Sequence, residues 1–253
     1  MVRGSILPVA ALLLAAGCGT GARIDAVEWT VMGTVAKVQT RGATDKAAVQ
    51  AVQAAFALVN DCLNAHDPGS ELSRLAGLTD DEILAQCNPA MRPCYEAAFR
   101  LRDETGGRFN PRWRGEGTMD LGAIAKGFAV DLAAADCRGA AQDLLIDLGG
   151  NLKSVRGRWR VGVYTPTGGA ATGRLELAAG EGCATSAKYF RGEHIRDGLS
   201  GAAATNDVVS VTVWHPSSAM LADGLSTVMF LLGRAEGERF LAAHYPEARA
   251  IWL

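Results

Sequence analysis

Apolar positions recur at helical spacing over four long stretches of the chain. Residues 44–64 are rich in Ala and Val at intervals of three and four, which predicts a long helix packed on a sheet. The same spacing predicts helices over residues 90–104, 121–135 and 217–232, and a short helix that starts at Ser70. Gly106 and Gly107 are expected to end the helix over residues 90–104.

Strands are predicted where β-branched and aromatic residues predominate between turn residues. This pattern covers residues 27–39 with an interruption at Gly33, and then 144–146, 159–164, 174–177, 208–214 and 250–253. Residues 149–151 predict a tight connection, and residues 184–187 a small polar turn. No linker divides residues 25–253. The order of elements predicts a single mixed α+β domain, with a largely antiparallel sheet favoured over a regular βαβ alternation.

Composition narrows the class of protein. A chain of 253 residues with 49% apolar content can bury a substantial core in one domain. Its net charge of −2 argues against a nucleic-acid partner, because such a surface would have to neutralise many phosphates.

The N-terminus has the layout of an export signal. Arg3 is the only charged residue among the first twenty, and an apolar run over residues 6–16 leads into Ala15-Ala16-Gly17-Cys18. The run is too short to span a bilayer as a mature helix. Small residues before a cysteine resemble a bacterial lipobox, so residues 1–18 are interpreted as a lipoprotein signal peptide, with Cys18 lipidated and residues 19–253 as the mature domain. The alternative is an ordinary signal peptide; either way, the mature protein lies outside the cytoplasm.

The remaining cysteines do not define a site. Their number is odd and their spacing fits no zinc template, so buried or partly paired thiols are expected. They are Cys62, Cys87, Cys94, Cys137 and Cys183.

Two separate segments carry residues suited to binding a metal and a diphosphate. Asp120, Ala123 and Lys126 recur every three residues around an expected helix start, and an unpaired Lys126 would be costly to bury among its small apolar neighbours. Asp223 and Thr227 lie four apart in an apolar helix, so their oxygens face the same way. A hard cation such as Mg²⁺ takes oxygen ligands together with substrate phosphates. Two structural alternatives stay open: an ordinary capped helix start for the first segment, and an exposed polar stripe for the second.

A third segment adds a possible base. His194 can accept a proton near neutral pH, and Arg191 or Arg196 can pair with phosphate, although a lone histidine is more often structural. His215 and His244 have no comparable cationic neighbours in the sequence and are interpreted as structural.

Together these segments resemble the ApbE family, the FAD:protein FMN transferases. The resemblance covers nearly the whole mature chain in order, and its most specific part is the sequence DLGAIAKGFAVD. The matching segments are residues 32–34, 70–75, 107–111, 120–131, 148–151, 184–191, 194–197, 210–213 and 222–227.

The resemblance implies a set of site residues. Mg²⁺ would be held by the Ala123 carbonyl, Asp223 and Thr227, with Ser226 adjacent. His194 would activate the acceptor hydroxyl and Lys126 would add a cation at the phosphates. The implied FAD contacts are Met32, His66, Arg108, Phe109, Asn110, Asp120, Lys126 and Arg196.

The chain also departs from the family pattern. Asn110 stands where the family has Asp, His66 where Tyr is common, and Ala187 where Gly follows Thr-Ser. Residues 198–201 replace the Pro-x-Thr-Gly of the histidine segment. Only nine residues separate Asn110 from Asp120, where the family has a much longer insertion.

The implied function is Mg²⁺-dependent transfer of FMN from FAD to a Thr or Ser hydroxyl of an acceptor protein, with release of AMP. Acceptors would be flavoprotein subunits of membrane electron-transfer complexes, reached by an enzyme anchored through Cys18 on the periplasmic side. Two alternatives stay open: hydrolysis of FAD to FMN and AMP at the same site, and a non-catalytic flavin-binding lipoprotein.

Overall fold

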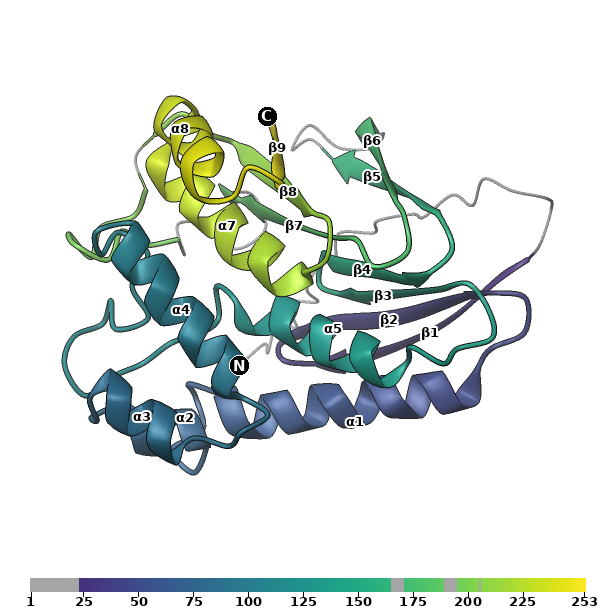
Figure 1. The fold of residues 1–253 in the computed structure, drawn as a ribbon, viewed down its shortest axis with the longest axis horizontal. Coiled ribbons are helices and arrows are strands. Elements are labelled where there is room, and N and C mark those ends of the chain that lie inside the picture. Colours follow the sequence, from purple (N-terminus) through teal and green to yellow (C-terminus); the bar gives the residue numbers. More distant parts are fainter. Residues whose placement is uncertain (1–22, 165–170, 189–194, 205) are drawn as a thin grey trace, which may run out of the picture.

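A seven-stranded antiparallel sheet forms the centre of the protein. The computed structural model describes residues 23–164, 171–188, 195–204 and 206–253. The sheet has the strand order β1-β2-β3-β4-β7-β8-β9 (Figure 1). Its strands are β1 (Ile24–Val31), β2 (Thr34–Arg41), β3 (Leu144–Leu148), β4 (Asn151–Arg156), β7 (Gly182–Ala187), β8 (Ser210–His215) and β9 (Arg249–Trp252).

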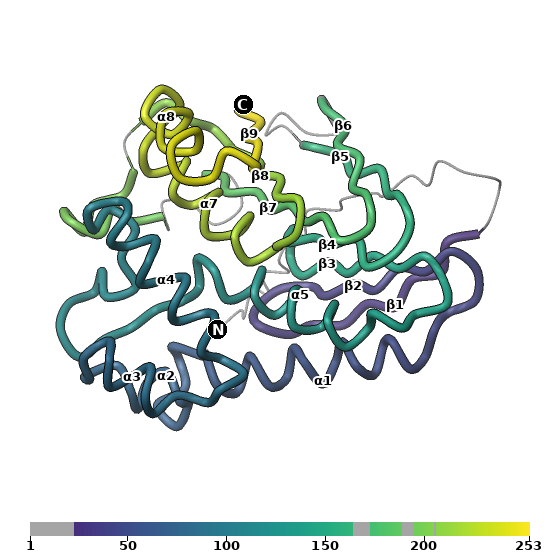
Figure 2. Tube along the Cα trace, in the orientation of Figure 1, coloured from purple at the N-terminus to yellow at the C-terminus, as the bar shows by residue number. Residues whose placement is uncertain are grey.

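Segments far apart in the sequence meet within this sheet. The N-terminal hairpin β1–β2 lies beside β3, with Val38 opposite Ile146 (Figure 2). This pairing places the turn between β1 and β2 next to the turn between β3 and β4, because Gly149 N donates to Val35 O over 3.0 Å.

Helices cover one face of the sheet. Figure 1 shows α1, α5 and α7 side by side across it, and both α5 and α7 contact the strands. The helices are α1 (Lys46–Leu63), α2 (Glu71–Leu75), α3 (Asp80–Gln86), α4 (Arg92–Glu104), α5 (Ala125–Asp136), α7 (Ala219–Leu232) and α8 (Arg234–His244).

Local sequence determines where several helices begin. Asp45 caps α1 by accepting from Ala48 N, and Ser70 caps α2 by accepting from Ser73 N. Thr79 and Glu82 form a reciprocal capping box at the start of α3. Each side chain satisfies backbone N–H groups that have no partner within the first turn of the helix.

The opposite face of the sheet is covered by a separate hairpin, β5 (Trp159–Tyr164) with β6 (Ala171–Leu177). Trp159 is fully buried there and packs in a small core with Leu145 and Leu152. Because β3 is covered on both faces, all five of its residues are buried.

The predicted α+β class and antiparallel pairing are confirmed. The expected helices over residues 44–64, 90–104 and 217–232 are present as α1, α4 and α7, although α5 begins at Ala125 rather than near Leu121. The predicted polar turn at residues 184–187 is wrong, since these residues belong to the inner strand β7. The helices α3 and α8 and the strand β4 were not expected.

The five described cysteines are free thiols, and Cys87, Cys94, Cys137 and Cys183 are buried. Burial raises the pKa of Cys137 to about 11 and that of Cys183 to about 12, so both stay protonated at neutral pH. Within the described ranges, no helix has the length and apolar character needed to cross a membrane.

The close approach of α5 to α7 depends on Gly127. A Cβ atom there would lie 2.3 Å from Ala219 O and 2.7 Å from Asp223 Cβ. Neither contact can be relieved by rotating a flexible side chain, so the two helices would have to separate.

Replacing Gly127 with Ala should therefore lower the free energy of unfolding by about 1–3 kcal/mol, as overpacking does in other cores. Urea denaturation measures the change. Gly139→Ala is the matched control, because no atom lies within 4 Å of a Cβ at that position. Equal stability of the two variants would contradict the packing argument.

Candidate active site

Two carboxylates, the buried Asp223 and the half-buried Asp131, connect α5 and α7. Asp223 of α7 accepts a hydrogen bond from Gly127 N in the first turn of α5, with Oδ2 2.9 Å away. Asp131 of α5 accepts from Ala219 N and Met220 N in the first turn of α7, at 2.9 and 3.0 Å. The helices run antiparallel at this contact, and each supplies a carboxylate to the N-terminal amides of the other. We call this pair the reciprocal carboxylate clamp.

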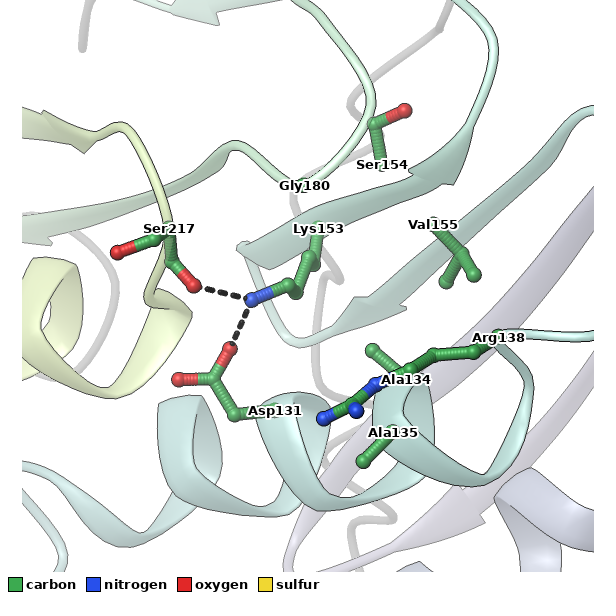
Figure 3. A pocket seen from close by; sticks show the side chains of 9 residues that line it. All are labelled: Asp131, Ala134, Ala135, Arg138, Lys153, Ser154, Val155, Gly180 and Ser217. Atoms are coloured by element: carbon green, nitrogen blue, oxygen red, sulfur yellow. Dashed lines mark hydrogen bonds and ion pairs between the residues drawn. The ribbon is translucent and has the colours of Figure 1, made fainter.

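Asp131 also receives two side-chain hydrogen bonds. Ser218 Oγ donates to it over 2.7 Å, and Lys153 Nζ from β4 donates over 2.7 Å. Figure 3 shows the Lys153 ammonium between Asp131 and the Ser217 carbonyl, beside a cavity of about 330 Å³ that Arg138 also lines. Four donors thus hold one carboxylate at the start of α7, where the helix dipole also favours a negative charge.

Lys126 of the first predicted half-site lies beside Asp223 of the second. Its Nζ donates to Gly122 O over 2.8 Å and lies 3.7 Å from Asp223 Oδ2. The sequence predicts that the Lys126 ammonium and the Asp223 carboxylate each require a partner, and the fold brings these two groups together. The Lys126 side chain is 18% exposed and that of Asp223 is 9% exposed, so the pair is largely, but not completely, removed from solvent.

Hydroxyl groups gather next to Asp223. Ser226 Oγ donates to Asp223 O, and it lies 2.8 Å from Ser186 Oγ of β7. Ser186 Oγ is also 3.4 Å from Thr227 Oγ1. Sequence reasoning did not select Ser186 as a site residue; the alternation of sides along β7 would have pointed it toward α7.

The donors at this position suit a hard cation. Asp223, Ser226 and Thr227 offer only oxygen, as would the Ala123 carbonyl that the resemblance adds to them, and one carboxylate with substrate phosphate is a usual Mg²⁺ arrangement. In the part of the chain that the structure describes, no three His, Cys, Asp or Glu residues form a metal-binding group. A metal here would therefore depend on the single carboxylate of Asp223 together with hydroxyl, carbonyl and phosphate oxygens.

Asp120 belongs to the turn before α5. Its Oδ1 accepts from Gly122 N over 2.8 Å, and Arg114 donates to its Oδ2 over 3.0 Å. The carboxylate therefore shapes the turn that carries Ala123 and presents the Gly122 carbonyl to Lys126.

Met32 occupies a strained turn between β1 and β2. Its φ of 49° lies in the left-handed region that non-glycine residues rarely adopt. The facing turn is held by Asp147, whose Oδ1 accepts from Gly150 N over 2.8 Å. Burial raises the pKa of Asp147 from 3.8 to about 6, although the Gly150 hydrogen bond and Lys37 oppose the shift.

The expected FAD contacts around Arg108 form a second anchored region. Arg108 pairs with Asp197 over 2.9 Å and with Glu236 over 3.2 Å, and it also donates to Leu231 O. Burial alone would raise the pKa of Asp197, but hydrogen bonds from Arg108 and from backbone amides hold it below the usual value. This pairing ties residues 195–203 to the end of α4.

The other expected site residues differ in exposure. Phe109 is buried, and Asn110 accepts from Arg112 N to form a local turn. Arg196 and His66 are exposed, and Arg196 pairs with Ala203 through a β-bridge. His194 and Cys18 lie outside the described residues.

The structural interpretation of His215 agrees with its burial, which lowers its pKa, and with the hydrogen bonds it accepts from Ser217 N and Ser218 N.

Comparisons with known proteins give one consistent result. A model of the ApbE family matches residues 112–252. A curated "FAD:protein FMN transferase" from Vibrio cholerae is 26% identical, over 93% of this chain and 90% of that protein. One from Treponema pallidum is 32% identical over 53% of this chain, but the match spans only 43% of that relative's length.

Solved structures agree on the fold. "Flavin Transferase ApbE from Vibrio cholerae" superposes with a TM-score of 0.77 at 21% identity, covering 91% of this chain and 93% of that one. The apo form of "Pseudomonas stutzeri flavinyl transferase ApbE" gives a TM-score of 0.74 at 21% identity, covering 91% of each chain.

The raised pKa of Asp147 predicts a pH-dependent contribution to stability. The folded protein holds a proton that the unfolded chain releases between about pH 4 and pH 6, so stability from this group falls as pH rises through that window. Between about pH 4 and pH 6, the free energy of unfolding of the wild type should fall by up to roughly 3 kcal/mol more than that of Asp147→Asn. Parallel pH profiles of the two proteins in urea denaturation would contradict the assignment.

The clamp makes Asp131 a structural residue. An amide at this position cannot accept from all four donors, so Asp131→Asn should lower the free energy of unfolding by about 1.5–3 kcal/mol. Asp136→Asn, an exposed position on the same helix, is the control and should change stability by less than about 0.5 kcal/mol. Chemical denaturation of both variants measures the difference. Equal stability of Asp131→Asn and Asp136→Asn would show that Asp131 does not stabilise the contact between α5 and α7.

Proposed function

The chain belongs to the ApbE family, and on that premise we propose that it is a flavin transferase, which moves FMN from FAD to a hydroxyl of another protein and releases AMP. The observation that carries the proposal is the convergence of Lys126, Asp223 and the Ser226–Thr227 hydroxyls where α5 meets α7. A lysine ammonium, a carboxylate and hydroxyl groups thus lie on neighbouring turns of α5 and α7, the kinds of group that bind a metal-bound diphosphate. The relatives named FAD:protein FMN transferase support the choice of substrate.

Mg²⁺ is the proposed metal. Asp223, Thr227 and the Ala123 carbonyl would hold it, with Ser226 adjacent, and Ser186 would keep the two hydroxyls in place. When bound, the ion would neutralise the diphosphate and stabilise the charge that develops on the leaving AMP. The structural role of Asp223 is compatible with this, because the Gly127 hydrogen bond uses one face of Oδ2.

The protein's own residues would position the reacting groups. Lys126 would donate to a phosphate oxygen in exchange for its bond to Gly122 O. The hydroxyl oxygen of an acceptor Thr or Ser forms a bond to the FMN phosphorus, and the bond from that phosphorus to the bridging oxygen breaks. His194 is proposed to take the proton of the acceptor hydroxyl, and the electron pair leaves on AMP.

The setting of the reaction is part of the proposal. Lipidation at Cys18 would hold the enzyme on the periplasmic side of a bacterial membrane. Its acceptors would then be flavoprotein subunits of membrane electron-transfer complexes.

The decisive assay is incubation of the whole chain with FAD, Mg²⁺ and an acceptor domain that carries a Ser-Gly-Ala-Thr segment. The wild type should give a covalent FMN adduct, measured by acceptor mass, with equimolar AMP. Asp223→Asn keeps an oxygen for Gly127 N but loses the charge that binds the metal, so the rate should fall at least about 100-fold. Asp136→Asn is the matched control and should transfer at the wild-type rate.

Other outcomes would point elsewhere. Release of FMN and AMP without an adduct would identify a hydrolase, and bound but unchanged FAD would identify a carrier. Full transfer by Asp223→Asn would refute the metal assignment while leaving the transferase in place.

A further inference from the structure

The short segment between Asn110 and Asp120 forms an anchored loop at the edge of the candidate site. Its ends are joined, because Asp120 N donates to Pro111 O over 2.8 Å. Arg112 fixes the loop to the α2–α3 region through Leu78 O at 2.8 Å and Asp80 at 3.2 Å. Pro111 and Met119 are buried, whereas residues 114–117 are exposed. The loop is therefore held at its base and open at its tip.

Trp113 and Arg114 lie at this tip as a stacked pair. The Arg114 guanidinium lies 4.8 Å from the centroid of a Trp113 ring, and the indole is only partly buried. An accessible aromatic ring beside a cation offers a face on which a planar ligand can stack.

A continuous series of contacts connects this pair to the candidate site. Arg114 donates to Asp120 Oδ2, and Asp120 Oδ1 accepts from Gly122 N. Gly122 O accepts from Lys126, whose ammonium lies 3.7 Å from Asp223. The stacked pair is thus fixed to the turn that presents Lys126, outside the position proposed for the diphosphate.

We propose that Trp113 and Arg114 form the platform on which a planar ring of FAD stacks, an inference that rests on the proposed function. FAD carries an aromatic ring system at each end of its diphosphate, so a ligand held at Lys126 and Asp223 extends a ring beyond the site on either side. Arg114, 42% exposed, stays paired with Asp120 and adds a cation beside the phosphates. Trp113 is then a binding residue in a segment where this chain is much shorter than the family pattern.

Binding of three probes tests the platform: FAD, FMN and ADP, each titrated calorimetrically into the whole chain without acceptor. Stacking of one base on an aromatic side chain contributes about 1–3 kcal/mol, so Trp113→Ala should raise the Kd of FAD roughly 5- to 150-fold. Trp113→Phe keeps an aromatic face and should stay close to the wild type. If only the Kd of FMN rises alongside that of FAD, the flavin ring stacks there; if only that of ADP rises, the adenine does.

Trp214 provides the matched control. It also stacks with an arginine, Arg249, at 5.2 Å, but it packs against the small core on the face of the sheet opposite α5 and α7. Trp214→Ala should leave all three Kd values unchanged. Unchanged FAD binding by Trp113→Ala, or equal weakening by Trp214→Ala, would overturn the platform. Failure of the wild type to bind FAD would instead overturn the proposed function.

Discussion

The structure depends on the reciprocal carboxylate clamp between α5 and α7. Each helix begins with backbone amides that have no partner within the helix, and a carboxylate on the other helix supplies one. The two contacts are four residues apart on both helices, so together they fix the helices along their length as well as side by side. Gly127 then permits the approach that both hydrogen bonds require.

This arrangement makes Asp223 part of both the fold and the candidate site. A buried carboxylate is costly unless donors and a counter-charge surround it, and here Gly127 N and Lys126 provide them. The carboxylate of Asp223 is already desolvated in the folded protein. Binding a metal therefore does not have to supply the free energy of removing water from this side chain. Ser186 connects the sheet to the same region, because its hydroxyl on β7 contacts the hydroxyls of Ser226 and Thr227 on α7.

Much of the fold could be predicted from the sequence, for identifiable reasons. α1 and α7 have long amphipathic or apolar patterns, and the two half-sites contain a lysine and an aspartate that need partners. β7 was not predicted because, apart from Thr185, Gly182–Ala187 consists of small residues with little strand preference, so its pairing with β4 and β8 determines its conformation. α8 is rich in charged residues, and β4 contains Lys153 and Ser154 at positions that a hydrophobic pattern does not mark. The role of Asp131 could not be predicted, because three of its four donors lie at the start of α7, almost ninety residues away, and the fourth, Lys153, lies on β4.

The strand order also constrains how the chain can assemble. β2 finds its second neighbour in β3, although α1 to α5 lie between them in the sequence. During synthesis the N-terminal hairpin therefore emerges long before the strand that completes it, and it keeps an open edge until residues 144–148 are available. Closing so long a loop has an entropic cost that must be met before the contacts between β2 and β3 can form, which disfavours this pairing early in folding. The turns of Met32 and Gly149, which face each other across that pairing, can acquire their final geometry only when the rest of the sheet is already in place.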